Sequence, residues 1–205
     1  MKIVTEKLEK KFRKEWIFTD FSYQFEQGNA YALTGPNGSG KSTLLKILSF
    51  YSLPTRGNIK MFQQTISIPT EIAYKHIAFS SPYIQLIEEF TLSELVQFCK
   101  NAHLITENTT LEAFENYIEL SPGKEKLISN FSSGMRQKVK LGLSLLSNRP
   151  ILLLDEPCTN LDRKAKDWFF TKLEETRDRL IIIASNEKEE IDFCQKSISI
   201  LDYKK

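Results

Sequence analysis

The sequence predicts an α/β fold with a mostly parallel sheet, an N-terminal antiparallel β subdomain and a helical subdomain inserted near the middle of the chain. Three observations support this class. Strand-like and helix-like segments alternate along the 205 residues. Two continuous apolar runs, "ILLLD" at 151–155 and "LIIIA" at 180–184, are typical of parallel strands that helices cover on both faces. A glycine-rich loop at 35–40 joins a short apolar run to a leucine-rich stretch.

The first third of the chain carries strand patterns and one helix. Residues 2–12 and 18–28 alternate apolar and polar side chains, which predicts two exposed-edge strands joined by a turn. The apolar run at 30–34 predicts a short buried strand, and residues 41–49 predict a helix. Residues 58–66 predict a further half-exposed strand.

The rest of the chain predicts a helical insertion followed by the remainder of the sheet. Apolar residues recur at helical spacing from Thr91 to about Asn130. The other expected segments are strands at 76–80, 149–157, 180–185 and 197–203 and helices at 134–146 and 162–180. We therefore expect a single domain over residues 1–205, with its core and β subdomain at about 1–82 and 136–205 and its helical subdomain at about 83–135.

Composition and charge exclude several classes of protein. Lys and Arg total 28 and Asp and Glu total 26, a formal charge of +2 that is too balanced for a main partner of nucleic acid or anionic membrane. No apolar stretch approaches bilayer length and the first residues do not resemble a signal peptide, so we expect a cytoplasmic protein. The widely spaced Cys99, Cys158 and Cys194 predict buried, reduced thiols.

The glycine-rich loop carries the strongest chemical signal. Gly35, Gly40, Lys41 and Ser42 satisfy the pattern G-x-x-x-x-G-K-[ST] between a predicted strand and a predicted helix, which is the context that the motif requires. The glycines let backbone N–H groups turn toward phosphate oxygens at the positive end of the helix. Lys41 supplies a charge to the phosphates and Ser42 a ligand for Mg²⁺. This motif predicts the RecA-like core of a phosphate-loop NTPase. The predicted phosphate-binding residues are Gly35, Pro36, Asn37, Gly38, Ser39, Gly40, Lys41, Ser42 and Thr43.

A second element is expected to complete the metal site. Asp155 ends the apolar run at 151–155, where a carboxylate can hold Mg²⁺ through water. Glu156 follows it and can act as the general base toward an attacking water. The alternative is a capped turn into a helix. Beside an intact phosphate loop, two successive carboxylates favour hydrolysis over binding alone.

Two longer segments resemble a known protein family, and the resemblance covers almost the whole chain. They are "GPNGSGKSTLL" at 35–45 and "FSSGMRQKVKLGLSLLSNRPILLLDEPCTNLD" at 131–162. Both resemble the nucleotide-binding subunits of ATP-binding cassette (ABC) transporters, and the resemblance implies ATP and Mg²⁺ as cofactors. It also implies a signature motif at Ser132, Ser133 and Gly134, in which Ser133 replaces the family's first glycine. Ser132 also fits an ordinary helix N-cap, and the resemblance adds that this helix end faces the γ-phosphate held by a second copy.

The resemblance assigns two further positions. Asp162 matches a loop that signals between the two copies of the cassette. Phe12 falls where an aromatic ring stacks on adenine in the family, and Trp16 is close enough to compete for that role. Ordinary core packing is the alternative for Phe12.

The chain departs from the family at two positions. Ungapped alignment puts Pro82 where the family has a glutamine that touches Mg²⁺ and the attacking water, and Gln85 can substitute only if the loop bulges. Asn186 stands where the family has a histidine that contacts the γ-phosphate. Asn186 can donate a hydrogen bond but cannot take up a proton, so we expect slow hydrolysis with Glu156 and Asn186 as the catalytic residues. His76 and His103 are in the wrong places to compensate.

The sequence thus predicts an ATPase subunit that works through partners. We expect a homodimer, or a heterodimer with a second cassette, in the ATP-bound state. We also expect an integral membrane transporter subunit that holds the cassette at the inner face of the cell membrane, with the helical insertion from roughly Tyr83 to Asn130 as its docking surface. A slow or non-hydrolysing regulatory cassette and a soluble cassette ATPase without a transport role remain the alternatives.

Overall fold

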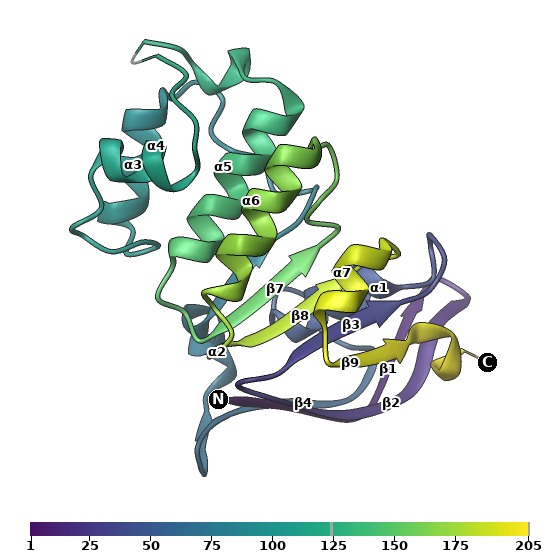
Figure 1. Ribbon diagram of the computed structural model, residues 1–205. Coiled ribbons are helices and arrows are strands. Elements are labelled where there is room, and N and C mark those ends of the chain that lie inside the picture. Colours follow the sequence, from purple (N-terminus) through teal and green to yellow (C-terminus); the bar gives the residue numbers. More distant parts are fainter. Residues whose placement is uncertain (124, 205) are drawn as a thin grey trace. The chain divides into compact units, whose positions relative to one another are not determined.

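The computed structural model describes residues 1–123 and 125–204 (Figure 1). Positions 124 and 205, which fall within the predicted helical subdomain and core, lie outside the described residues. The chain divides into two compact units. Unit 1 comprises Met1–Phe79, Arg149–Glu156 and Arg177–Lys205, and unit 2 comprises Ser80–Asn148 and Pro157–Thr176.

Unit 1 begins with a four-stranded antiparallel sheet in the order β2-β1-β4-β5. Its strands are β1 (Lys2–Phe12), β2 (Glu15–Glu26), β4 (Arg56–Gln63) and β5 (Ile66–Ile68). Because β1 pairs with both β2 and β4, the prediction that β1 is an edge strand is wrong, whereas β2 does lie at an edge. The single strand expected at 58–66 is two strands, because Gln64 takes a φ of 55° and turns the chain back.

The second sheet has the order β6-β7-β8-β3-β9 and consists of β6 (Ile77–Ser80), β7 (Ile151–Asp155), β8 (Leu180–Ala184), β3 (Ala30–Thr34) and β9 (Lys196–Ser199). The pairs β7–β8, β8–β3 and β3–β9 are parallel. The apolar runs of β7 and β8 are buried along their full length, as their sequences predict. The expected last strand is shorter, because the chain turns into a 3₁₀ helix, η3 (Ile200–Tyr203), after Ser199.

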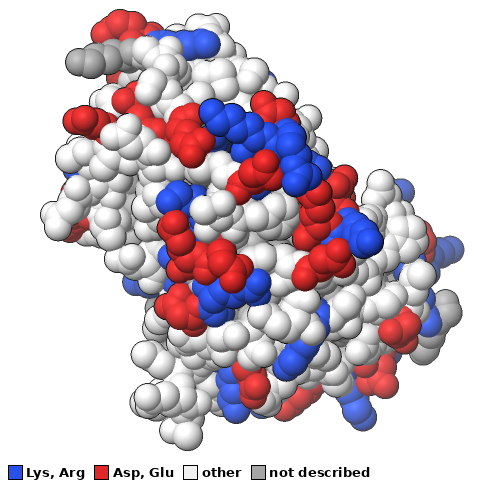
Figure 2. Space-filling model, in the orientation of Figure 1, with Lys and Arg blue, Asp and Glu red and all other residues white. Residues whose placement is uncertain are grey.

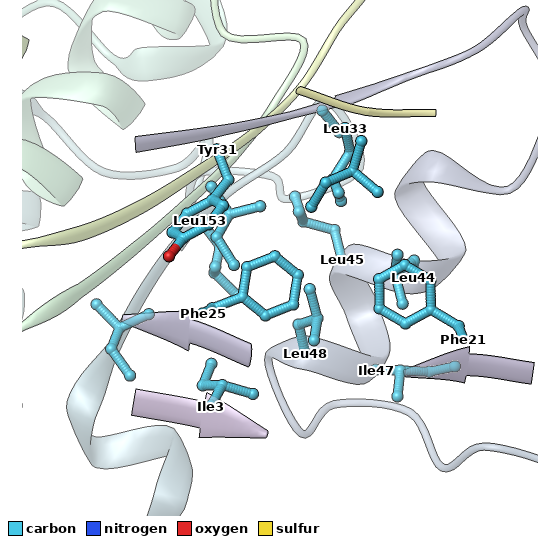
Figure 3. Close-up of a cluster of buried hydrophobic side chains, with 14 of the residues drawn as sticks. Ile3, Phe21, Phe25, Tyr31, Leu33, Leu44, Leu45, Ile47, Leu48 and Leu153 are labelled. Carbon is cyan, nitrogen blue, oxygen red and sulfur yellow. The ribbon is translucent and has the colours of Figure 1, made fainter. Parts of the chain in front are cut away.

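Helix α1 (Lys41–Leu48) connects the two sheets of unit 1 through a shared core (Figure 3). Ile3, Phe21 and Phe25 of the antiparallel sheet gather with the leucines of α1 and with Tyr31 of β3. Each such buried side chain stabilises the fold by about 1.5–3 kcal/mol relative to its exposed state. The phosphate loop that precedes α1 is therefore anchored by packing on both sides of the helix. The short helices α2 (Thr70–Ala73), η1 (Tyr74–His76) and α7 (Lys188–Phe193) complete unit 1.

Unit 2 is helical and contains α3 (Leu92–Asn101), α4 (Leu111–Tyr117), η2 (Ile128–Asn130), α5 (Ser133–Leu146) and α6 (Arg163–Glu174). Thr91 and Glu94 form a reciprocal capping box that fixes the start of α3. The indole of Trp168 on α6 donates a 2.7 Å hydrogen bond to the carbonyl of Tyr117 at the end of α4. Across the described residues, no helix has the length and apolar character needed to cross a bilayer.

Candidate nucleotide-binding site

The phosphate loop lies between the end of β3 and the start of α1. Gly40 is the N-cap of α1 and has a φ of 110°, a conformation that residues with a side chain rarely adopt. A Cβ at this position would lie 2.4 Å from Cγ2 of Ile17, so the loop approaches β2 too closely for any larger residue. Pro36, Asn37 and Gly38 at the crest of the loop are exposed. The backbone of the crest is thus available to a ligand.

Lys41 and Ser39 place polar groups against this loop. The Lys41 ammonium is buried and donates hydrogen bonds to the carbonyls of Gly35, at 2.6 Å, and Pro36, at 3.4 Å. The Ser39 hydroxyl is also buried and has no hydrogen-bond partner among the described residues. A buried polar atom without a partner costs about 1–3 kcal/mol, so its presence inside the loop indicates a site built for a polar ligand.

The two predicted metal ligands meet at the edge of the sheet. Ser42 Oγ donates a 2.9 Å hydrogen bond to Asp155 Oδ1, although the residues are 113 positions apart in the sequence. Asp155 is the last residue of β7 and is 1% exposed. A hydroxyl and a carboxylate are hard oxygen donors of the kind that Mg²⁺ prefers, with phosphate oxygens and waters as its other ligands. The residues present therefore fit Mg²⁺.

Glu156 has an unusual backbone conformation. Its φ is 46°, in the left-handed region that a glutamate seldom occupies, and its N–H donates a 2.9 Å hydrogen bond to the carbonyl of Ala184 on β8. Such conformations cost about 1–3 kcal/mol and persist where the surrounding structure holds them, often at functional sites. The backbone thus turns sharply between the buried Asp155 and the half-buried Glu156.

Asn186 is the second residue after β8, and its side chain contacts the phosphate loop. Its Nδ2 donates a 3.1 Å hydrogen bond to Oδ1 of Asn37 at the crest. The side-chain amide has a second N–H, which remains able to donate. The structure therefore brings together, within unit 1, the phosphate loop, Asp155, Glu156 and Asn186.

The signature residues and Asp162 come together within unit 2. Ser132 caps α5 and accepts a 3.2 Å hydrogen bond from the N–H of Met135. Asp162 caps α6 in the same manner, at 2.8 Å from the N–H of Ala165. Ser132, Ser133, Gly134 and Asp162 line one pocket of about 460 Å³. The helix N-terminus at this pocket can face an anion.

Pro82 and Gln85 line a different pocket of unit 2, of about 270 Å³. Arg136 and Lys140 of α5 line it as well. Burial lowers the pKa of Lys140, and the neighbouring Arg136 charge lowers it further. Both Pro82 and Gln85 are exposed. That Gln85 takes over the role of the family's glutamine stays a prediction.

The two aromatic candidates for adenine differ in their surroundings. Phe12 is 52% exposed at the end of β1, so its interpretation as core packing is wrong. Trp16 is partly buried, and the charged groups of Lys11 and Arg56 lie 5.0 and 5.5 Å from its ring centroid. Among the described residues, the charged group of Lys10 lies 5.1 Å from the ring centroid of Phe12. Phe12 is therefore the more accessible ring.

The sequence did not predict two polar contacts of the structure. One is the Asn37–Asn186 hydrogen bond, because nothing in the spacing predicts which loop residue Asn186 meets. The other involves Gln137, which is buried on α5 and donates a 2.7 Å hydrogen bond to the carbonyl of Pro157. A polar residue at a buried position of an amphipathic helix is the signal that marks Gln137. His103, by contrast, is exposed on unit 2 beside Glu107.

The fold and the phosphate loop define the class of protein, a phosphate-loop NTPase. Residues 18–159 match the ABC transporter family, and the chain belongs to that family. It is 33% identical over 193 residues to the uncharacterized ABC transporter ATP-binding protein YybJ of Bacillus subtilis (strain 168), with 90% of this chain and 85% of that protein aligned. The predicted class and family are confirmed.

Two further comparisons extend this result. The chain is 26% identical to the linearmycin resistance ATP-binding protein LnrL of the same strain, over 96% of this chain and 65% of that protein. It thus spans about two-thirds of the length of that relative. A dimeric ATP-binding cassette solved in a post-hydrolysis state with ADP and Pi matches with a TM-score of 0.82 at 20% identity, covering 96% of this chain and 93% of that one. At this identity the likeness demonstrates the shared fold.

Proposed function

We propose that this chain binds and hydrolyses ATP as a transporter subunit, and that its pairing with a second cassette powers a separate membrane subunit. The observation that carries the proposal is the 2.9 Å approach of Ser42 Oγ to Asp155 Oδ1 beside the phosphate loop. The proposed metal ligand Asp155, the phosphate-binding Lys41 and the proposed base Glu156 all belong to unit 1. This common location supports binding and hydrolysis by one group of residues.

The phosphate loop supplies the binding step. Lys41 exchanges its contacts with the Gly35 and Pro36 carbonyls for phosphate oxygens, and the loop N–H groups at the start of α1 add their partial positive charge. Ser42 and Asp155 would hold Mg²⁺, which neutralises phosphate charge when it is bound. The exposed ring of Phe12 is suited to stack on adenine, with Trp16 as the alternative.

Two residues of unit 1 are proposed to act on the chemical step. Glu156 accepts a proton from the attacking water, and its constrained backbone fixes the direction of the Cα–Cβ bond from which the carboxylate extends. Asn186 donates a hydrogen bond to the γ-phosphate with the N–H that Asn37 does not engage. Loss of one transition-state hydrogen bond commonly lowers the rate by about 10²–10³, and an amide in place of histidine recovers part of it. Hydrolysis is therefore proposed to be slow.

A second copy is proposed to complete each site. Ser132, Ser133 and Gly134 at the start of α5, together with Asp162, would meet nucleotide held by the partner cassette, in a homodimer or in a heterodimer with another cassette. Closure follows only if ATP favours the closed pair, because a ligand shifts a population by its differential affinity. The helical insertion at roughly 83–130, which belongs to unit 2, would dock a membrane subunit at the cytoplasmic face of the membrane. The formal charge of +2 supports a role without nucleic acid, and on the face in Figure 2 acidic and basic side chains lie beside each other.

The experiment compares ATP binding and phosphate release for the wild type and Glu156→Gln. We expect the wild type to release phosphate slowly, and Glu156→Gln at least about 10-fold more slowly with an unchanged Kd for ATP. Glu71→Gln, which makes the same chemical change at an exposed position of α2, is the matched control. Equal rates for the wild type and Glu156→Gln would remove Glu156 from its role.

A regulatory cassette is the second candidate, because Pro82 and Asn186 both depart from the residues that assist hydrolysis in the family. Such a protein binds ATP and closes without useful turnover. A wild-type dimer that persists for hours in MgATP, without phosphate release, would favour this candidate over the transport ATPase.

A further inference from the structure

The segment that follows Glu156, residues 157–162, is held by α5 at its first residue. The Gln137 side chain donates a 2.7 Å hydrogen bond to the carbonyl of Pro157. Gln137 is 4% exposed and Pro157 is buried, so water cannot replace this hydrogen bond without opening the structure. Leaving the carbonyl unpaired in this buried position would destabilise the structure.

The same helix also contacts the 157–162 segment near its other end. A Cβ built on Gly134 would lie 3.0 Å from the carbonyl oxygen of Asn160, so the backbone of α5 and that of the segment are in close contact there. Asn160 itself has a φ of 65°, and the N–H of Leu161 bonds to the carbonyl of Cys158 at 3.1 Å. The segment is therefore a compact turn that rests on the first turns of α5.

Glu156 lies between two fixed points of the backbone. Its own N–H is bonded to Ala184 on β8, and the carbonyl of the next residue, Pro157, is bonded to Gln137 on α5. Glu156 ends a stretch of unit 1 and Pro157 begins a stretch of unit 2. Its left-handed φ of 46° requires restraint from both sides, since an unrestrained glutamate would relax to an ordinary conformation.

We propose that Gln137 is a positioning residue for Glu156, and that the Gln137–Pro157 hydrogen bond sets the direction of the Glu156 carboxylate for hydrolysis. This inference rests on the proposed function. Gln137 acts through the backbone and does not contact nucleotide in this scheme. Its loss is expected to lower kcat while leaving the affinity of unit 1 for ATP unchanged, because the phosphate loop, Ser42 and Asp155 keep their own contacts.

The test replaces the amide with an apolar side chain of similar length, Gln137→Met, and measures kcat, the Kd for ATP and hydrogen exchange. We expect kcat to fall about 10-fold or more, Kd to change less than 2-fold, and amides of residues 158–162 to exchange faster while those of α1 do not change. Val139→Ala, a destabilising change at a fully buried position of the same helix, is the control and should retain kcat. Gln137→Leu serves as the second variant if Gln137→Met does not fold.

A double-mutant comparison separates this inference from the proposed function. If Gln137 acts through Glu156, Gln137→Met in the Glu156→Gln background should lower the residual rate less than 2-fold. A full additional loss of rate, or a parallel loss of ATP affinity, would overturn the positioning role. If the wild type and Glu156→Gln hydrolyse ATP equally, the proposed function fails. The positioning role would then fail with it, whereas a slow Glu156→Gln protein beside a Gln137→Met protein with the wild-type kcat would overturn the positioning role alone.

Discussion

At the residue scale, the side chain of Asn186 lies against Asn37 of the phosphate loop. Their side chains share a 3.1 Å hydrogen bond in which Asn186 donates. An amide can offer a hydrogen bond to phosphate, but it stays neutral, whereas an imidazolium adds charge to the same contact. The position after β8 is therefore expected to limit the rate of hydrolysis and to affect ATP binding less.

Asn186→His should raise the rate of phosphate release by about 10-fold or more at neutral pH, because imidazole can both donate to the γ-phosphate and carry a proton. Steady-state phosphate release with and without the substitution is the measurement. Asn186→Ala removes the donor and should be slower than the wild type. A His variant no faster than the wild type would mean that this position does not limit hydrolysis.

Part of the site was predictable from single residues. Asp155 had to lie near Ser42, because the carboxyl ends of parallel strands β7 and β3 meet at one edge of the sheet. The Asn37–Asn186 and Gln137–Pro157 hydrogen bonds could not be predicted, because they depend on side-chain directions that no sequence spacing encodes. The exposure of Phe12 was equally undecidable, since an aromatic residue at a strand end can face either way.

Among the elements, strands that are buried on both faces were predicted more accurately than strands that are buried on one face. The continuous apolar runs of β3, β7 and β8 defined their strands closely, because few other structures bury every side chain of such a run. The alternating apolar and polar patterns predicted the strands and their neighbours less accurately. Alternation shows that one face is buried but not how many strands lie alongside, so β1 was wrongly expected at an edge. The 58–66 segment concealed a turn at Gln64, where no glycine marked the positive φ.

Gly142 on α5 determines how closely α4 packs, and Gly142→Ala should destabilise the protein by about 1–3 kcal/mol. A Cβ at this position would lie 2.2 Å from Cγ2 of Ile118 and 3.4 Å from the ring of Phe114. Urea denaturation measures the free energy of unfolding. The double variant Gly142→Ala with Ile118→Ala makes room for the new methyl group and should lose less than the sum of the two single changes. A Gly142→Ala protein as stable as the wild type would contradict this packing.

At the scale of the whole molecule, thiols in the interior link stability to alkaline pH. Burial raises the pKa of Cys99 to about 11 and that of Cys194 to about 12. Cys99 and Cys158 are buried and Cys194 is partly buried, in agreement with the predicted packing role of the cysteines. Thiols with such raised pKa values hold few thiolates near neutral pH, so they are poor nucleophiles.

Stability should therefore fall as pH rises from about 9 toward the folded-state pKa values. In this range the unfolded chain releases thiol protons that the folded chain retains, which favours unfolding by about 1.4 kcal/mol for each unit of pKa difference. Urea midpoints at pH 8, 9 and 10 measure the loss. Cys99→Ala combined with Cys194→Ala should flatten the decline. An identical decline in this double variant would assign the effect to other groups.

The left-handed backbone at Glu156 also bears on how such a protein can be engineered. Glycine occupies that region of φ and ψ without the steric cost that a glutamate meets there. Selection for heat resistance alone would thus tend to replace Glu156 with glycine. The resulting protein would be more stable, and we expect it to bind nucleotide without hydrolysing it. Keeping turnover in a thermostability screen requires selecting for both properties at once.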